Sequence, residues 1–101
     1  MNALNHLNRM VSRNAIVVNQ LGMHARAAAK FVHLATKYQA QIRVLRESRE
    51  VDGKSIMGIL LLAAARGTTI SINADGSDER EAIEALAALV ASGFGEDVCS
   101  A

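Results

Sequence analysis

Hydrophobic residues recur along the chain with two different periods. Where they occupy every second position, as in residues 41–46, the pattern predicts a strand with one buried face. Where they recur at intervals of three and four, as at Ala28, Phe31 and Ala35, the pattern predicts an amphipathic helix. The predicted elements are strands within residues 12–19, 41–46, 50–52 and 68–73, and helices over residues 25–38, over residues 56–64, and from a cap at Ser77 or Asp78 up to Gly93.

The resulting order, β-α-β-β-α-β-α, predicts an α+β fold of two layers. Strands with one apolar face and helices with one apolar stripe bury these surfaces against each other. Only a short charged turn separates the strands at residues 41–46 and 50–52, so these two strands must pair as an antiparallel hairpin. An antiparallel sheet with the helices on one face satisfies these patterns.

Three local signals mark the ends of the predicted helices. Ser55 follows a turn and precedes an apolar run, which is the position of an N-cap. Asp78 and Glu81 have the spacing of a capping box at the start of the last helix. Gly67 lies just past the second helix, where a glycine commonly ends a helix.

Length and charge limit the classes of protein to which the chain can belong. Its 101 residues, 50% of them hydrophobic, allow one domain with its own core. The 11 basic and 10 acidic residues give a net charge of +1, and only 3% of residues are aromatic, which argues against a nucleic-acid partner. We expect a domain over residues 11–97, preceded by a flexible extension at residues 1–10 and followed by a short tail at residues 98–101.

Cysteine usage and hydropathy favour a protein of the cytoplasm. The single cysteine, Cys99, makes neither an internal disulfide nor a zinc cage, and it suits a reducing compartment. The longest apolar run, residues 56–65, has about half the length of a membrane span, so no membrane insertion is expected. The spacing of His24 and His33 does not place two ligands on one helix face, and we expect neither a metal nor a cofactor.

His24 lies between a glycine-containing turn and the start of the first predicted helix. A cation is disfavoured at the positive end of a helix, whereas the free backbone N–H groups there bind phosphate. Arg26 adds a permanently charged donor fork, and a neutral imidazole is a nucleophile near neutral pH. This chemistry fits a histidine that accepts a phosphoryl group; a capping or surface histidine is the alternative. The sequence offers His24 no evident acidic or basic partner, so a catalytic triad is not expected.

Two separated motifs carry a family resemblance. Residues 22–26, GMHAR, are followed by three alanines, and residues 53–59 read GKSIMGI. The first segment resembles the active-site signature of HPr, the histidine-containing phosphocarrier of the phosphoenolpyruvate-dependent phosphotransferase system. The second resembles the regulatory serine motif of that family, at the expected distance. The resemblance covers residues 11–97 and implies an open-faced β-sandwich, in which a four-stranded antiparallel sheet carries three helices on one face.

The resemblance also implies roles for individual residues. His24 would accept a phosphoryl group at Nδ1 from phospho-enzyme I and pass it to IIA components, and Arg26 would stabilise the phosphate. Ser55 would be the target of an ATP-dependent HPr kinase/phosphorylase. The chain would be a stoichiometric phosphoryl carrier for sugar transport rather than an enzyme, and we expect a monomer. The implied partner-docking patch consists of Ile56, Met57 and Ile59.

Two alternatives stay open at this point. One is a regulatory binding module, or a nitrogen-branch phosphocarrier, that acts through phospho-Ser55 on a transcriptional regulator. The other concerns the start of the protein, because both Met1 and Met10 are candidate start residues.

Ala27 stands where the family commonly has proline after the active-site arginine, which affects how rigidly His24 is presented. Since alanine is the best helix former, we expect the helix itself to be kept.

Overall fold

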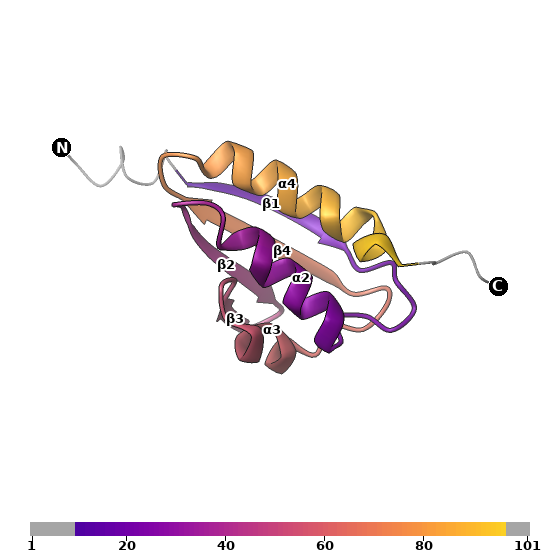
Figure 1. Ribbon diagram of the computed structural model, residues 1–101. Coiled ribbons are helices and arrows are strands. Elements are labelled where there is room, and N and C mark those ends of the chain that lie inside the picture. Colours follow the sequence, from indigo (N-terminus) through magenta and orange to yellow (C-terminus); the bar gives the residue numbers. More distant parts are fainter. Residues whose placement is uncertain (1–9, 97–101) are drawn as a thin grey trace.

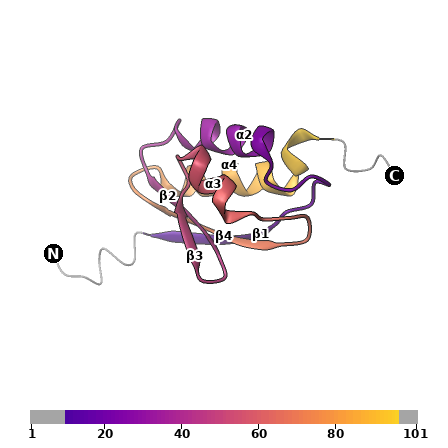
Figure 2. The same cartoon turned by 90° about the horizontal axis from the view of Figure 1, so that it is seen from below.

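Within residues 10–96, which are the residues that the computed structural model describes, four antiparallel strands form one open sheet with three α-helices on one face (Figures 1 and 2). Residues 1–9 of the expected extension and the tail at residues 98–101, with Cys99, lie outside the described residues. The predicted order of elements and the open-faced α+β architecture are confirmed. The elements are β1 (Val11–Ile16), α2 (Ala25–Ala35), β2 (Gln41–Arg46), β3 (Arg49–Asp52), α3 (Ile56–Leu62), β4 (Thr69–Asp75), α4 (Glu79–Ala91) and the 3-10 helix η1 (Gly93–Gly95).

The strand order in the sheet is β1-β4-β2-β3, and every neighbouring pair is antiparallel. Val44 of β2 pairs with Ile72 of β4, and both side chains are fully buried. The pairing of β2 with β3 confirms the predicted hairpin. β1 ends at Ile16, before the end of the apolar run that predicted it, although the next residue, Val17, is still buried and its N–H donates to the Thr68 carbonyl.

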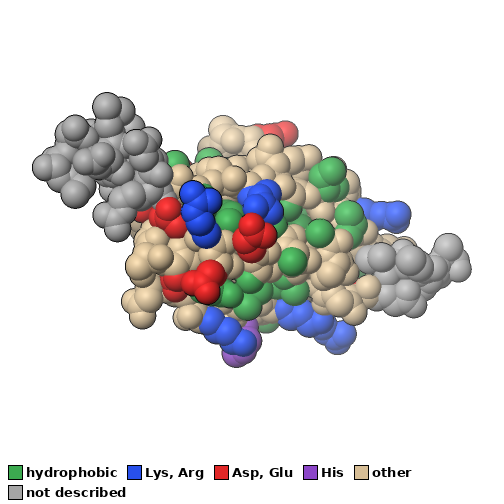
Figure 3. Space-filling model, turned by 90° about the horizontal axis from the view of Figure 1, so that it is seen from above, with side chains coloured by type: hydrophobic (Ala, Val, Ile, Leu, Met, Phe, Trp, Pro, Cys, Tyr) green, Lys and Arg blue, Asp and Glu red, His purple; other side chains and the backbone are tan. Residues whose placement is uncertain are grey.

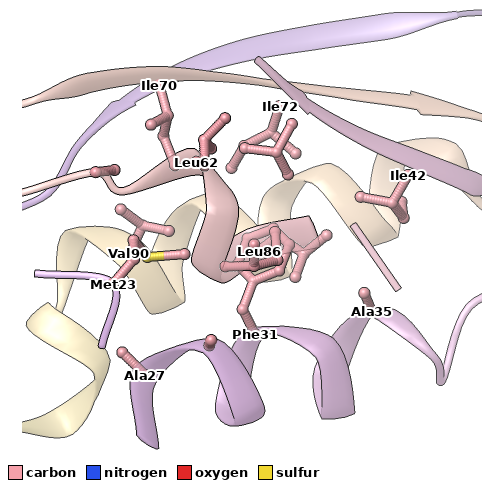
Figure 4. Packing of buried hydrophobic residues seen from close by; sticks show 14 of the residues in the cluster. Met23, Ala27, Phe31, Ala35, Ile42, Leu62, Ile70, Ile72, Leu86 and Val90 are labelled. Atoms are coloured by element: carbon pink, nitrogen blue, oxygen red, sulfur yellow. The ribbon is translucent and has the colours of Figure 1, made fainter. Parts of the chain in front are cut away.

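Side chains from all three α-helices meet the sheet in one hydrophobic core (Figure 4). Phe31 of α2, Leu86 of α4, Leu62 of α3 and Ile70 of β4 all belong to this core, in the space between the helices and the sheet. All four side chains are fully buried. Because burying a side chain of this size contributes roughly 1.5–3 kcal/mol, packing rather than intrinsic propensity holds the short helices in place.

The surface over α4 and β1 mixes hydrophobic side chains with charges of both signs (Figure 3). Arg13 of β1 and Glu84 of α4 form an ion pair there at 3.3 Å, with both side chains exposed. An exposed pair of this kind contributes less than about 1 kcal/mol, so it adds little to the docking of α4. Among residues 10–96, no helix is long and apolar enough to cross a bilayer.

Two helices end earlier than their sequence patterns predicted. α2 ends at Ala35, because the N–H groups of Lys37 and Tyr38 donate to carbonyls three residues back and tighten the last turn. α3 ends at Leu62, because Ala63 adopts a left-handed backbone conformation with φ 54°. The prediction that Gly67 ends this helix is therefore wrong.

The predicted capping box at the start of α4 is also wrong. Asp78 makes no side-chain bond to its own helix; its carboxylate accepts from the backbone N–H groups of Gln39 and Ala40, both at 2.8 Å. Glu79 instead accepts from the N–H of Gly76 at 2.9 Å. The hydrogen bond from Gln39 is the main cause that lowers the pKa of Asp78, so this ionised carboxylate ties the start of α4 to the start of β2.

We expect Asp78→Ala to lower the melting temperature at neutral pH and to remove part of its dependence on acid. Because the pKa of Asp78 in the folded protein lies below its ordinary value of 3.8, the carboxylate stabilises the fold above pH 3.8, and this stabilisation is lost as the pH falls through the lower, folded value. Thermal unfolding curves of the two proteins should converge in strong acid. Ser77→Ala, at an exposed neighbour, is the control, and a constant difference at every pH would contradict this account.

Candidate functional site

The loop that leads to His24 is folded against the end of α3. The Met23 N–H donates to the Ala64 carbonyl at 3.0 Å, and the Met23 side chain is buried in the core. Gly22 adopts φ +65°, and a Cβ at this position would lie 2.7 Å from the Ala64 oxygen. The fully buried Asn19 bridges the loop, because its Nδ2 donates to the Gly22 carbonyl at 2.7 Å. Only glycine fits this approach without strain, so the glycine of the GMHAR segment determines where His24 lies.

His24 is the N-cap residue of α2, and both ring nitrogens have partners. Its backbone is extended, with φ −71° and ψ −179°, and its Nδ1 accepts from the Arg26 N–H at a long 3.4 Å. Its Nε2 lies 2.6 Å from a carboxylate oxygen of Glu96. The His24 side chain is 28% exposed, so a partner can reach it. His24 therefore caps α2, which was one of the alternatives that the sequence left open, and its ring is accessible as well.

Glu96 reaches His24 from the other end of the chain. α4 and η1 end beside the loop before α2 (Figure 1), and η1 is anchored there by the buried Phe94, whose carbonyl accepts from Lys30 Nζ at 2.7 Å. Asn19 Nδ2 donates to the second carboxylate oxygen of Glu96 at 3.0 Å. The hydrogen bond with His24, and more weakly the one from Asn19, lowers the pKa of Glu96, so Glu96 is ionised near neutral pH.

The sequence showed no evident acidic partner for His24, and the structure supplies one, Glu96. Glu96 lies 72 positions away in the chain, and no spacing rule links such distant residues. The only sequence signal near Glu96 was the pair of glycines at 93 and 95. They marked the end of the last helix, but they did not show that this end lies next to His24. Among residues 10–96, no group of three or more His, Cys, Asp or Glu side chains is placed to hold a metal ion.

The hydrogen bonds of His24 define which ring nitrogen is nucleophilic. An ionised carboxylate only accepts hydrogen bonds, so Nε2 carries the proton that it donates to Glu96. Nδ1 accepts from Arg26 N–H and therefore holds the lone pair. This lone pair points toward the start of α2, where unpaired N–H groups and the helix dipole favour an anion. The exposed Arg26 lines the same hollow as His24, together with Leu21 and Glu96.

Ser55 caps the neighbouring helix. Its Oγ accepts from the Gly58 N–H at 3.0 Å, which confirms the predicted N-cap of α3. Of the expected docking residues, Ile56 is 45% exposed and Met57 is 65% exposed. Ile59 is fully buried and belongs to the core, so its assignment to the docking surface is corrected. The helical period explains this result, because Ile59 lies on the face of α3 that packs inward.

The two motifs lie on one side of the molecule. α2 and α3 are in contact, and Ile56 lines a hollow between them together with Arg26, Val32 and His33. Leu61 adds to this apolar surface: it is 61% exposed on α3, one turn after Met57. Exposed apolar side chains near an accessible nucleophile are typical of a surface that a protein partner covers.

Comparison with known proteins decides the family. Residues 11–92 match the family model described as PTS HPr component phosphorylation site. The chain belongs to the HPr family. A phosphocarrier protein HPr of Cupriavidus necator is 48% identical over 87 residues, which are 86% of this chain and 98% of that protein. A solved HPr structure from Thermoanaerobacter tengcongensis has a TM-score of 0.83 at 42% identity, covering 86% of this chain and 98% of that chain.

An HPr dimer from Thermoanaerobacter tengcongensis is also similar to this chain, with a TM-score of 0.69 at 46% identity and coverage of 79% and 92%. The expected monomer stays a prediction. The resemblance of the two motifs to HPr is confirmed, since both lie inside the matched residues. Ala27, where HPr proteins commonly have proline, is fully buried, and α2 still begins at Ala25. Glu96 lies outside the matched residues.

We expect Gly22→Ala to destabilise this HPr-family chain by more than about 1 kcal/mol. An alanine there must adopt a strained left-handed backbone conformation, and its Cβ also meets the Ala64 carbonyl. Gly67→Ala is the matched control: its φ is +90°, but a Cβ there has no atom within 4 Å. The free energies of unfolding come from urea denaturation of the three proteins. If both substitutions lower the free energy of unfolding by the same amount, the close approach of Gly22 to Ala64 does not contribute to the destabilisation.

Proposed function

We propose that this chain carries a phosphoryl group on Nδ1 of His24, received from phospho-enzyme I and passed to IIA components of the sugar phosphotransferase system. The single observation that supports this proposal most strongly is the hydrogen bonding of His24: Nε2 donates to Glu96, and the Nδ1 lone pair faces the start of α2. Membership of the HPr family, in which the Cupriavidus necator relative is named a phosphocarrier, supports a carrier rather than a catalyst. We place this exchange in the cytoplasm.

The transfer step exchanges one phosphorus–nitrogen bond for another. The Nδ1 lone pair of His24 attacks the phosphorus of the donor phosphohistidine, and the bond between phosphorus and the donor nitrogen breaks with its electron pair returning to that nitrogen. The His24 ring keeps its proton on Nε2 and becomes a phosphorylated imidazolium. Glu96 faces this new positive charge, while the phosphoryl oxygens lie near the N–H groups at the start of α2 and near Arg26.

We also propose that phosphorylation of Ser55 by an HPr kinase/phosphorylase regulates this transfer. A phosphate at Ser55 adds about −1.5 to −2 charges next to Ile56 and Met57, which are exposed and apolar. Enzyme I must bury this surface to reach His24, and desolvation of an unpaired charge is costly. The effect is therefore on docking, and the fold itself need not change.

We expect enzyme I and phosphoenolpyruvate to add one acid-labile phosphoryl group to the wild type and none to His24→Ala. His33→Ala is the matched control, because His33 is an exposed histidine of the same helix without a place in the transfer step. Intact-mass measurement before and after mild acid treatment gives the result. Phosphorylation of the His24→Ala protein would contradict the assignment, and an unmodified wild type would favour a module that acts through Ser55 alone.

We expect Ser55→Asp to slow phosphorylation of His24, mainly by weakening the encounter with enzyme I. Ser55→Ala separates charge from capping: it removes the bond to the Gly58 N–H and costs about 1 kcal/mol of stability, but adds no charge to the docking surface. The measurement is the initial rate of phosphorylation against enzyme I concentration for the three proteins. Identical curves for wild type and Ser55→Asp, together with normal behaviour of genuine phospho-Ser55 protein, would leave Ser55 as a helix cap only.

A further inference from the structure

Glu96 forms the shortest hydrogen bond of His24, yet it lies outside the residues that match the family model. It is held at both carboxylate oxygens: one contacts His24 Nε2 at 2.6 Å, and the other accepts from Asn19 Nδ2 at 3.0 Å. Its side chain is only 18% exposed. A carboxylate bound at both oxygens and largely shielded from water has a defined orientation toward the ring.

We propose that Glu96 is a positioning residue that keeps His24 in the tautomer protonated at Nε2. In this proposal Asn19 orients the terminal group of residue 96, because it determines which of the two terminal atoms lies next to Asn19 and which faces the ring. The proposal rests on the proposed function, because the tautomer matters for transfer only if Nδ1 is the nucleophile. In the other tautomer, Nδ1 carries a proton and has no lone pair to form a bond with phosphorus. Glu96 thus selects the reactive nitrogen without contacting the phosphoryl group.

The segment that carries Glu96 is anchored independently of His24. Phe94 is 1% exposed, and its backbone adopts φ +60°, which turns the chain sharply after α4. Its carbonyl accepts from Lys30 Nζ, which projects from α2 one to two turns after His24. The helix that presents His24 therefore also holds the segment that presents Glu96, so the carboxylate and the ring keep their relative position.

Asn19 makes the proposal specific, because both N–H bonds of its amide are used. One donates to the Gly22 carbonyl at 2.7 Å and the other to Glu96 at 3.0 Å, so Asn19 offers residue 96 only a donor. In Glu96→Gln, the amide oxygen must take the place next to Asn19. The NH₂ group then faces His24 Nε2 as a donor, which requires Nε2 to accept and moves the ring proton to Nδ1.

This geometry predicts an unusual order of severity. Glu96→Ala removes the partner of Nε2 and leaves the ring free to keep the productive tautomer, so we expect transfer to slow by about tenfold, as for loss of an outer partner of a functional histidine. Glu96→Gln imposes the unproductive tautomer. The equivalent acid-to-amide change in a Ser-His-Asp triad costs about 10⁴ in rate, and in this more open site we expect a loss on the order of 100-fold. The more conservative substitution is thus the more damaging one.

The experiment compares wild type, Glu96→Ala, Glu96→Gln and the control Glu84→Gln. The control makes the same chemical change at an exposed glutamate of α4 that pairs with Arg13, away from His24. Two-bond ¹H–¹⁵N NMR of the histidine side chains at about pH 9, where imidazoles are neutral, identifies the protonated nitrogen of His24. Rapid-quench measurement of phosphoryl transfer from phospho-enzyme I gives the rates.

We expect protonation at Nε2 in wild type and Glu84→Gln, protonation at Nδ1 in Glu96→Gln, and transfer rates that fall from wild type through Glu96→Ala to Glu96→Gln. The proposal is overturned if Glu96→Gln keeps its proton on Nε2, or if it transfers as fast as Glu84→Gln. The NMR measurement needs no phosphoryl donor. A wild type that enzyme I does not phosphorylate would therefore refute the proposed function, while the tautomer of Glu96→Gln would still decide the role of Glu96.

Discussion

The burial of Phe31 between the other helices and the sheet is the constraint on which the rest of this structure depends. Phe31 lies on the inner face of α2, in the same core cluster as Leu86 of α4 and Leu62 of α3, and is fully buried. Together with the fully buried Ala28 and Ala35 on the same helix, this side chain sets the direction and height of α2 above the sheet. The first residue of the helix, with His24 before it, then has one position in space. The geometry of the candidate site is in this sense a consequence of core packing.

Three segments that are far apart in the sequence converge at that position. The loop from β1 is drawn against the end of α3 by the bond between Met23 N–H and the Ala64 carbonyl, and the C-terminal turn is drawn against α2 by Lys30. Asn19 connects the loop with Glu96. Each of these contacts satisfies a polar group at the edge of the core. Together they place Glu96 and the start of α2 against the two ring nitrogens of His24, whose side chain stays 28% exposed.

The two helix starts on this side of the molecule have related chemistry. His24 and Ser55 are both N-cap residues, so each presents a side-chain acceptor to backbone N–H groups, and a phosphoryl group on either residue meets the positive end of a helix. The exposed Ile56 and Met57 lie beside Ser55, while the hollow that Ile56 lines extends to Arg26. A single partner surface that covers one motif therefore contacts the surroundings of the other.

The sequence by itself determined the elements and their order, and it marked His24, Arg26 and Ser55 as the residues proposed to carry the chemistry, because these signals depend on local physics. Periods of two and three to four residues identify strands and helices from neighbouring positions alone, and a histidine before an arginine at a helix start is visible in a few residues. The tertiary structure alone decided which way each side chain faces. It buried Ile59 and left Ile56 exposed, and it directed Asp78 to another segment rather than to its own helix. It also brought Glu96 to His24 across 72 positions, since only the packing of α4 and η1 against α2 places these two residues side by side.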